Sequence, residues 1–159
     1  MLTGHRAVLP LRICLVVLFV ILVVLQVMSF PGQFAYMARQ NPDDAYLRWP
    51  LTALAAYWLL CAEIVVIATW RLLSLVTSDR IFSESSFRWV NAIIAAIGAA
   101  WLVLAALWLW VGWHADDPGV PLLMFLLVVG LAVFGLLMIV MRSLLRQATN
   151  LRTDMEAVI

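Results

Sequence analysis

Lysine is absent from this 159-residue chain, and only 12% of the residues are charged. An ordinary soluble domain has about 25% charged residues, so this shortage argues against a soluble protein. Cysteine occurs twice, as Cys14 and Cys61, with no neighbouring cysteine at CxxC spacing, which argues against a thiol oxidoreductase. We expect both to be buried as small apolar side chains, without a disulfide between them.

Motifs for catalysis are also missing. The chain has no glycine-rich phosphate loop, no serine-centred nucleophile motif and no pair of histidines spaced for a haem or metal. His5 and His114 are far apart, and the acidic residues near His114 are typical of a solvated loop. We therefore expect no catalytic, cofactor-binding or metal site, no cofactor and no enzymatic activity.

Apolar residues, in contrast, make up 66% of the chain and are concentrated in four long stretches. Each has about 20 residues, the length of helix that crosses the ~30 Å hydrocarbon core of a bilayer. The sequence predicts an all-α integral membrane protein, a single membrane domain over residues 1–159 with four transmembrane helices. The predicted spans are 13–30, 51–70, 91–110 and 121–141, followed by a tail over 142–159.

The ten basic residues, all arginine, are unevenly distributed between the connections. Eight precede the first span, follow the fourth, or lie between the second and third; only Arg39 and Arg48 lie elsewhere. Because positive charge is enriched on the cytoplasmic side, this pattern predicts that both termini and the central connection are cytoplasmic.

Breaks and caps are expected in each of the three connections. Pro31-Gly32 should end the first helix, and Asn41-Pro42 is typical of a turn. In the central connection, Ser83 is a candidate N-cap for the third helix, with Glu84 in the favourable first turn and Phe82 as a hydrophobic staple. The third connection is expected over 112–119.

Two further patterns concern packing. Most tryptophans lie near the ends of the spans and are predicted to anchor the helices at the interfaces, whereas Trp58 and Trp101 are deeper and should pack between helices. Small residues in the third span, among them Ala96 and Gly98, and two glycines in the fourth, Gly130 and Gly135, favour close helix contacts.

Glu63 is the single acidic residue inside a predicted span. It precedes Arg71 by eight residues, which places it ~12 Å from the inner boundary. Charged residues at such depth usually face the helix bundle and mark ion or proton pathways. Glu63 is therefore a candidate proton or ion site; the alternative is a structural hydrogen bond to a neighbouring helix or attraction to the inner arginines.

The tail carries apolar residues at alternating intervals of three and four, a heptad pattern typical of a helix. We expect the fourth helix to continue into the cytoplasm as an amphipathic tail. Its apolar residues could pack on the central connection, lie on the lipid surface with the arginines near anionic headgroups, or contact a partner helix. The candidate contact residues, here named the tail stripe, are Leu144, Ala148, Leu151, Met155 and Val158.

Two segments carry a resemblance to a known family. They are Ile81-Phe82-Ser83-x-x-Ser86-Phe87 in the central connection and Leu144-Leu145-Arg146-Gln147-Ala148-x-x-Leu151-Arg152 in the tail. With the four-span plan, they resemble the bacterial membrane family named domain of unknown function 2975. The resemblance implies a four-helix protein of the bacterial cytoplasmic (inner) membrane and, since some members are encoded beside helix-turn-helix regulators, a regulator as partner. It implies no activity.

We therefore expect a non-enzymatic, multi-pass membrane protein that acts through cytoplasmic protein contacts in a regulatory or accessory role. Its expected surroundings are the lipid bilayer and a cytoplasmic protein; a homo-oligomer is left open, and direct nucleic acid binding is not expected. The alternative is a small proton-coupled transporter, or a transporter subunit, that uses Glu63.

Overall fold

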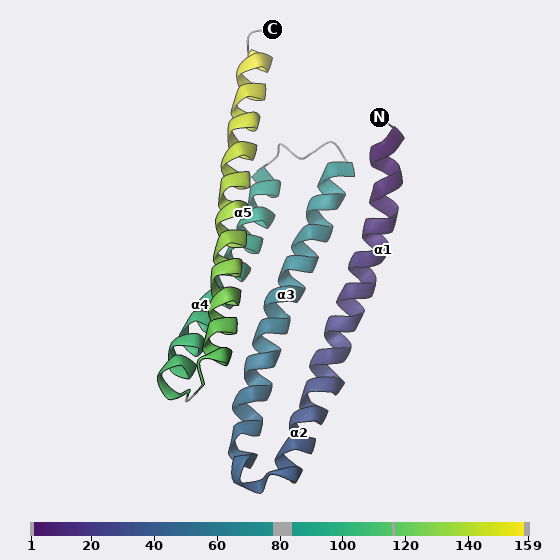
Figure 1. The fold of residues 1–159 in the computed structure, drawn as a ribbon. Coiled ribbons are helices and arrows are strands. Elements are labelled where there is room, and N and C mark those ends of the chain that lie inside the picture. Colours follow the sequence, from purple (N-terminus) through teal and green to yellow (C-terminus); the bar gives the residue numbers. More distant parts are fainter. Residues whose placement is uncertain (1, 78–83, 116, 158–159) are drawn as a thin grey trace. The chain divides into compact units, whose positions relative to one another are not determined.

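The computed structural model of the protein describes residues 2–77, 84–115 and 117–157 (Figure 1). Every regular element in these ranges is helical, which confirms the predicted all-α class. The elements are α1 (Leu2–Val24), a π turn η1 (Leu25–Ser29), α2 (Phe30–Gln40), a 3-10 turn η2 (Pro42–Leu47), α3 (Arg48–Thr77), α4 (Glu84–His114) and α5 (Gly119–Ala157).

Four helical segments are long and apolar enough to cross a membrane, in agreement with the four predicted spans. Many large apolar side chains of α1 and α5 are exposed on the protein surface. A soluble monomer rarely exposes an apolar surface of this extent, whereas lipid tails would cover it. The four segments are Val8–Gln40, Ala45–Thr77, Ser86–His114 and Gly119–Leu151.

The chain divides into two compact units, Met1–Leu73 and Ser74–Ile159. In the first, α1 packs along α3 through a small apolar core centred on Leu15, Leu22 and Val66. Near one end of this seam, the guanidinium carbon of Arg12 lies 5.7 Å from the centroid of the Trp70 ring. This cation–π contact means that Trp70 packs within the unit, in addition to any role at the membrane interface.

The prediction that Pro31-Gly32 ends the first helix is wrong, because the helical backbone continues through both residues to Gln40. A proline inside a helix removes one donor and clashes with the carbonyl four residues earlier. Here a π turn precedes Pro31, and the Phe30 N–H donates to the Leu25 carbonyl, five residues back. The wider turn and the position of Pro31 in the first turn of α2 accommodate the ring. The predicted break at Asn41 is confirmed, since α2 ends there.

The second unit is an antiparallel hairpin of α4 and α5 (Figure 1). A Cβ atom built on Gly135 of α5 would lie 3.3 Å from Cγ2 of Ile97 on α4, so the glycine permits a close approach at that point. The Trp101 indole N–H donates to the Val128 carbonyl oxygen at 3.0 Å, a second link between the two helices. Trp101 thus packs between helices as predicted.

Other packing predictions are met only in part. Ala96 is buried, but Gly98 and Gly130 adjoin open space, so a small residue at close-contact spacing does not by itself mark a contact. Both cysteines are free, and Cys61 is buried as expected. The prediction that Cys14 is buried is wrong, because this residue is exposed on α1.

The ends of α4 also differ from expectation. The helix reaches His114, so Gly112 and Trp113 belong to it and the connection to α5 is shorter than predicted. Glycine is tolerated there because, in a membrane, backbone N–H and C=O groups that are hydrogen-bonded within a helix are more stable than unpaired ones. At its other end α4 begins at Glu84; the predicted cap Ser83 and staple Phe82 lie outside the described residues.

Candidate functional site

Glu63 lies on the face of α3 that packs against α1. Leu59 and Val66 of that seam precede and follow it by four and three residues, so the three side chains share one helical face. Glu63 is half-buried, and its Oε1 atom is buried without a hydrogen-bond donor among the described residues. The structure therefore places the predicted candidate toward the helix packing, as expected of a membrane carboxyl group.

A buried oxygen without a donor destabilises the fold by about 1–3 kcal/mol relative to a hydrogen-bonded one. Such an atom can accept a hydrogen bond from a donor that enters between the helices. Within the described residues no group of three or more His, Cys, Asp or Glu side chains could hold a metal ion. Among the described residues, Glu63 is thus a carboxyl group with no metal-binding set around it and no donor to its Oε1 atom.

A groove of about 210 Å³ opens one turn further along the same seam. Val66 and Ile67, three and four residues after Glu63, form part of its wall together with Trp70. All of its lining residues are apolar, so it offers an acyl chain or another apolar group a place but provides no polar path to Glu63. The lining is completed by Leu15, Val16 and Phe19.

The tail stripe lies on a regular helix, because α5 is unbroken from Gly119 to Ala157. Leu144 is 53% exposed, Leu151 64% and Met155 68%, and Ala148 is also exposed. Within the second unit, the described residues therefore leave this apolar face uncovered. Val158 lies outside the described residues, as does the segment 78–83 of the central connection, one of the three surfaces on which the stripe was expected to lie.

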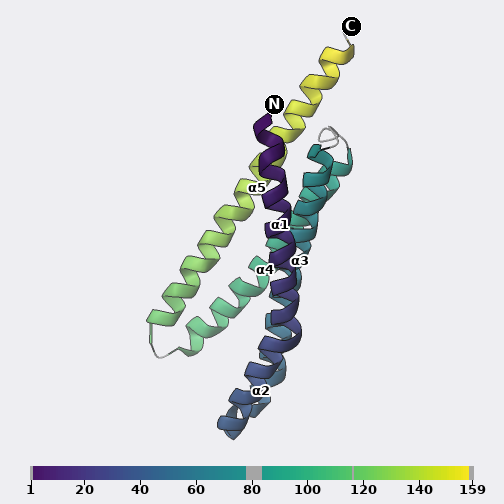
Figure 2. The same cartoon turned by 90° about the vertical axis from the view of Figure 1, so that its right-hand side faces the viewer.

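The tail continues the axis of the membrane-spanning part of α5. Both views show one straight helix (Figures 1 and 2), and no proline or glycine follows Gly135 before its end at Ala157. The 16 helical residues after Met141 add ~24 Å at the usual rise per residue. The structure has no bend at which the tail could turn sideways.

The opposite face of the tail contacts α4 and forms a polar cleft with it. The cleft has a volume of about 560 Å³ and includes three arginines, Arg88 from α4 and Arg142 and Arg146 from α5. This cleft could not be predicted from the sequence, because its residues come from two helical segments more than 50 positions apart. The remaining lining residues are Phe87, Asn91, Thr149 and Asn150.

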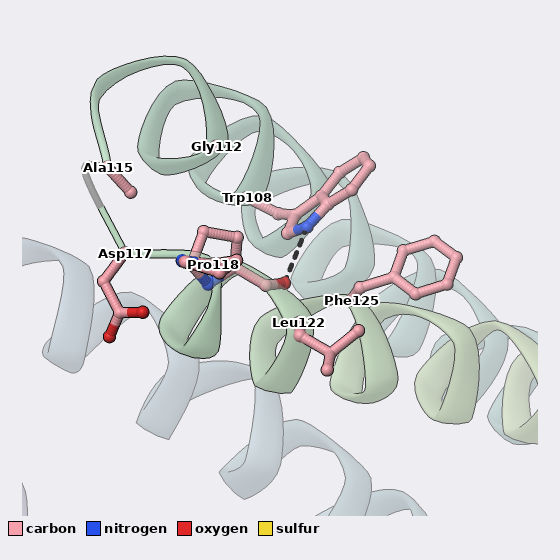
Figure 3. Close-up of a pocket in the computed structure, with 8 residues that line it drawn as sticks. Trp108, Gly112, Ala115, Asp117, Pro118, Leu122 and Phe125 are labelled. Atoms are coloured by element: carbon pink, nitrogen blue, oxygen red, sulfur yellow. Dashed lines mark hydrogen bonds between the residues drawn. The ribbon is translucent and has the colours of Figure 1, made fainter.

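At the other end of the hairpin, a cleft of about 570 Å³ lies beside the α4–α5 connection (Figure 3). The Trp108 indole N–H donates to the Pro121 carbonyl oxygen at 3.0 Å, and its ring centroid lies 5.3 Å from that of Phe125. Figure 3 shows the Asp117 carboxylate directed away from the two rings. Trp108, expected to be an interface anchor, therefore also fastens the two helices at this end.

Two polar residues at this end, His114 and Asp117, contact residues close to them in the sequence. His114 stacks on Trp110 with ring centroids 4.9 Å apart, and its Nδ1 lies 2.9 Å from the Trp110 carbonyl oxygen. Asp117 accepts a hydrogen bond from the Gly119 N–H at 3.3 Å, at the start of α5. These contacts favour the interpretation of the segment as a structural turn.

A family described as "Protein of unknown function (DUF2975)" matches residues 32–159. The chain belongs to this family. The match includes both segments that carry the predicted resemblance, 81–87 and 144–152. No curated protein and no solved structure matches the chain.

The DUF2975 region contains most features described above. Glu63, the tail stripe and the arginine cleft all lie within it, together with α3, α4 and α5. The apolar groove has half of its lining on α1, outside the matched residues. Family membership thus identifies a protein of unknown activity, and the function has to be argued from the sites themselves.

Proposed function

We propose that this DUF2975 protein is a non-enzymatic, multi-pass protein of the bacterial cytoplasmic (inner) membrane that binds a cytoplasmic protein through the tail stripe, in a regulatory or accessory role. The observation that carries the proposal is the exposed apolar face of α5 that follows the predicted span 121–141, with Leu144, Leu151 and Met155 all exposed. Apolar surface exposed to water favours association with another apolar surface.

The proposed cytoplasmic location of the tail is based on the distribution of arginine along the chain. Eight of the ten arginines lie before the first span, after the fourth, or between the second and third, so the tail is placed in the cytoplasm by the positive-inside rule. The tail then meets cytoplasmic proteins, including a helix-turn-helix regulator of the kind that the family resemblance implies.

A protein partner is favoured over the lipid surface by the shape of α5. A helix that lies on a bilayer must run nearly parallel to it, whereas a transmembrane helix is tilted by only ~20° on average from the bilayer normal. Because α5 is unbroken between its span and Ala157, the tail must leave the membrane along the axis of the span. The stripe then projects away from the lipid and is available to a partner helix.

The test is co-purification of the full-length protein from its own membranes in native lipids. Replacing Leu151→Ser and Met155→Ser together should release the bound protein. Fully burying a leucine or methionine side chain contributes about 1.5–3 kcal/mol, and the two are about two-thirds exposed here. Their loss should weaken binding by ~2–4 kcal/mol, or roughly 30- to 1,000-fold.

Gln147→Ser with Asp154→Ser is the matched control, because it changes two exposed polar residues of the same helical segment. Recovery of the partner should be unchanged with this pair. Equal recovery with wild type and the stripe variant would contradict the proposal. If the stripe variant instead converts a dimer of this chain to a monomer on light scattering, the partner is a second copy and the proposed cytoplasmic protein is wrong.

A second candidate function is proton-coupled transport, by the protein alone or as a transporter subunit. It is favoured by the Glu63 Oε1 atom, which is buried and has no donor among the described residues. A carboxyl group in this position could exchange a proton for a cationic substrate. The wholly apolar lining of the adjoining groove favours the first proposal instead.

Transport is tested with wild type and Glu63→Gln in proteoliposomes loaded with a pH-sensitive dye. The transport hypothesis expects proton flux driven by a cationic substrate with wild type, and none with the variant. Flux that is absent from wild type, or equal in the two proteins, would eliminate it. Glutamine keeps the size of the side chain, so a folding defect is a minor concern.

A further inference from the structure

We propose that the cleft between α4 and α5 formed by Arg88, Arg142 and Arg146 binds a phosphate group, supplied in the membrane by the headgroup of an anionic lipid. The inference is independent of the tail stripe and of Glu63. It rests on the convergence of three cationic side chains in one cleft, and no acidic residue is found among the described residues that line it.

The geometry brings together charges that repel one another. Arg142 and Arg146 are four residues apart on α5, and like charges at that spacing destabilise a helix. Arg88 adds a third positive charge from the facing helix. An anion between them would convert this repulsion into attraction, which is the physical reason to expect one.

The chemistry of the lining suits phosphate. A guanidinium group presents a planar set of N–H donors that matches two oxygens of a phosphate, and arginine is preferred over lysine for such recognition. The amides of Asn91 and Asn150 add uncharged donors in the same cleft.

The position of the cleft favours a lipid as the source of the phosphate. Arg142 immediately follows Met141, the last residue of the predicted fourth span, so the cleft lies where headgroups are expected. Phe87 provides an apolar wall beside the arginines, suited to the glycerol and first methylenes of a lipid. The volume of about 560 Å³ is in the range of ligand pockets in general.

Lipid and protein partner could bind at the same time. Leu144 of the tail stripe lies two residues from both Arg142 and Arg146, or ~200° around the helix at 3.6 residues per turn. The stripe and the cleft are thus on opposite faces of α5, as the exposure of Leu144 also indicates. Failure of either proposal leaves the other standing.

The experiment uses full-length protein in an uncharged detergent, mixed with equal amounts of phosphatidylglycerol and phosphatidylcholine and examined by native mass spectrometry. Wild type is expected to retain phosphatidylglycerol preferentially. Arg146→Gln should weaken that binding by about fivefold, the effect of removing one basic residue next to an anionic headgroup. Arg146 is exposed, so the substitution should not prevent folding.

Two further variants distinguish binding of the lipid in this cleft from a general attraction of anionic lipid to a positively charged protein. Arg39→Gln removes the same charge from an exposed position of α2 and should leave lipid retention unchanged. Asn91→Leu keeps the net charge but removes a donor of the cleft, and should weaken retention by roughly two- to tenfold. Equal effects of Arg39→Gln and Arg146→Gln, or no preference of wild type for phosphatidylglycerol, would overturn the proposal.

A final arm distinguishes lipid from free phosphate. Inorganic phosphate is titrated into delipidated wild type and Arg146→Gln in a calorimeter. Heat of binding with wild type alone, without a preference among lipids, would overturn the lipid as source and assign the cleft to soluble phosphate. No difference between the two proteins in either arm would overturn the site altogether.

Discussion

Replacing Gly135 by leucine should loosen the α4–α5 hairpin. At this position even a Cβ atom would come within 3.3 Å of the Ile97 side chain, whereas at Gly130, five residues earlier on the same helix, nothing lies within 4 Å. Gly130→Leu is therefore a matched control. Both substitutions gain up to ~1 kcal/mol from better helix propensity, so their difference isolates the contact with α4.

The expected magnitude follows from that contact. Forcing extra carbon atoms into a packed position costs about 1–3 kcal/mol, so Gly135→Leu should be less stable than Gly130→Leu by this amount. Ile97→Ala removes the side chain that the new leucine meets. The double variant should then be more stable than the sum of the single effects predicts, with a coupling energy of at least ~1 kcal/mol.

The assay is unfolding by increasing mole fractions of SDS in a mild detergent, followed by tryptophan fluorescence. Trp101 and Trp108 bridge the two helices, so separation of the hairpin changes their surroundings. Equal midpoints for Gly135→Leu and Gly130→Leu, or strict additivity with Ile97→Ala, would refute the close packing of α4 and α5 at this point.

Three further substitutions test other contacts in the same assay. Trp101→Phe should lower the stability by about 0.6 kcal/mol, the mean value of an interhelical hydrogen bond in a membrane protein; an unchanged midpoint would show that the bond to Val128 contributes nothing. Glu63→Leu should raise the stability by ~1–3 kcal/mol, because it removes a buried oxygen that has no donor among the described residues; a loss of stability would reveal a partner for the carboxyl group. Leu151→Ser should change it by less than ~0.5 kcal/mol, since this side chain is exposed; a larger loss would mean that the stripe packs within the protein.

The four helices could be predicted from the sequence because their signal is local. A run of about 20 apolar residues is sufficient to indicate a span, and no long-range information is needed. The course of the chain at Pro31 could not be predicted, since proline usually ends a helix and a preceding π turn leaves no recognised trace in the sequence. The close contact at Gly135, and its absence at Gly98 and Gly130, depends on which faces of α4 and α5 meet, and the sequence does not specify these faces.

The candidate sites, like the fold, could be predicted only where the pattern lies within one helix. The heptad pattern identified the face of α5 that holds Leu144, Leu151 and Met155, because apolar residues on one helix share a period. That this face is uncovered could not be predicted, since the same pattern also suits internal packing. The cleft of Arg88, Arg142 and Arg146 could not be predicted, because sequence periodicity relates only residues on the same helix. Arginines that follow a membrane span are interpreted first as signals of which end of the span is cytoplasmic.

The length and continuity of α5 make it a lever. The helix extends ~24 Å beyond Met141, and it contains no glycine or proline after Gly135 at which it could bend. The membrane-spanning part and the C-terminal end of α5 therefore move together. A change of 10° in the tilt of the hairpin, of the kind that follows a change in bilayer thickness, would swing that end by about 4 Å. Such a displacement is comparable to half the spacing of packed helices. A change in membrane thickness would thereby change the position of the tail.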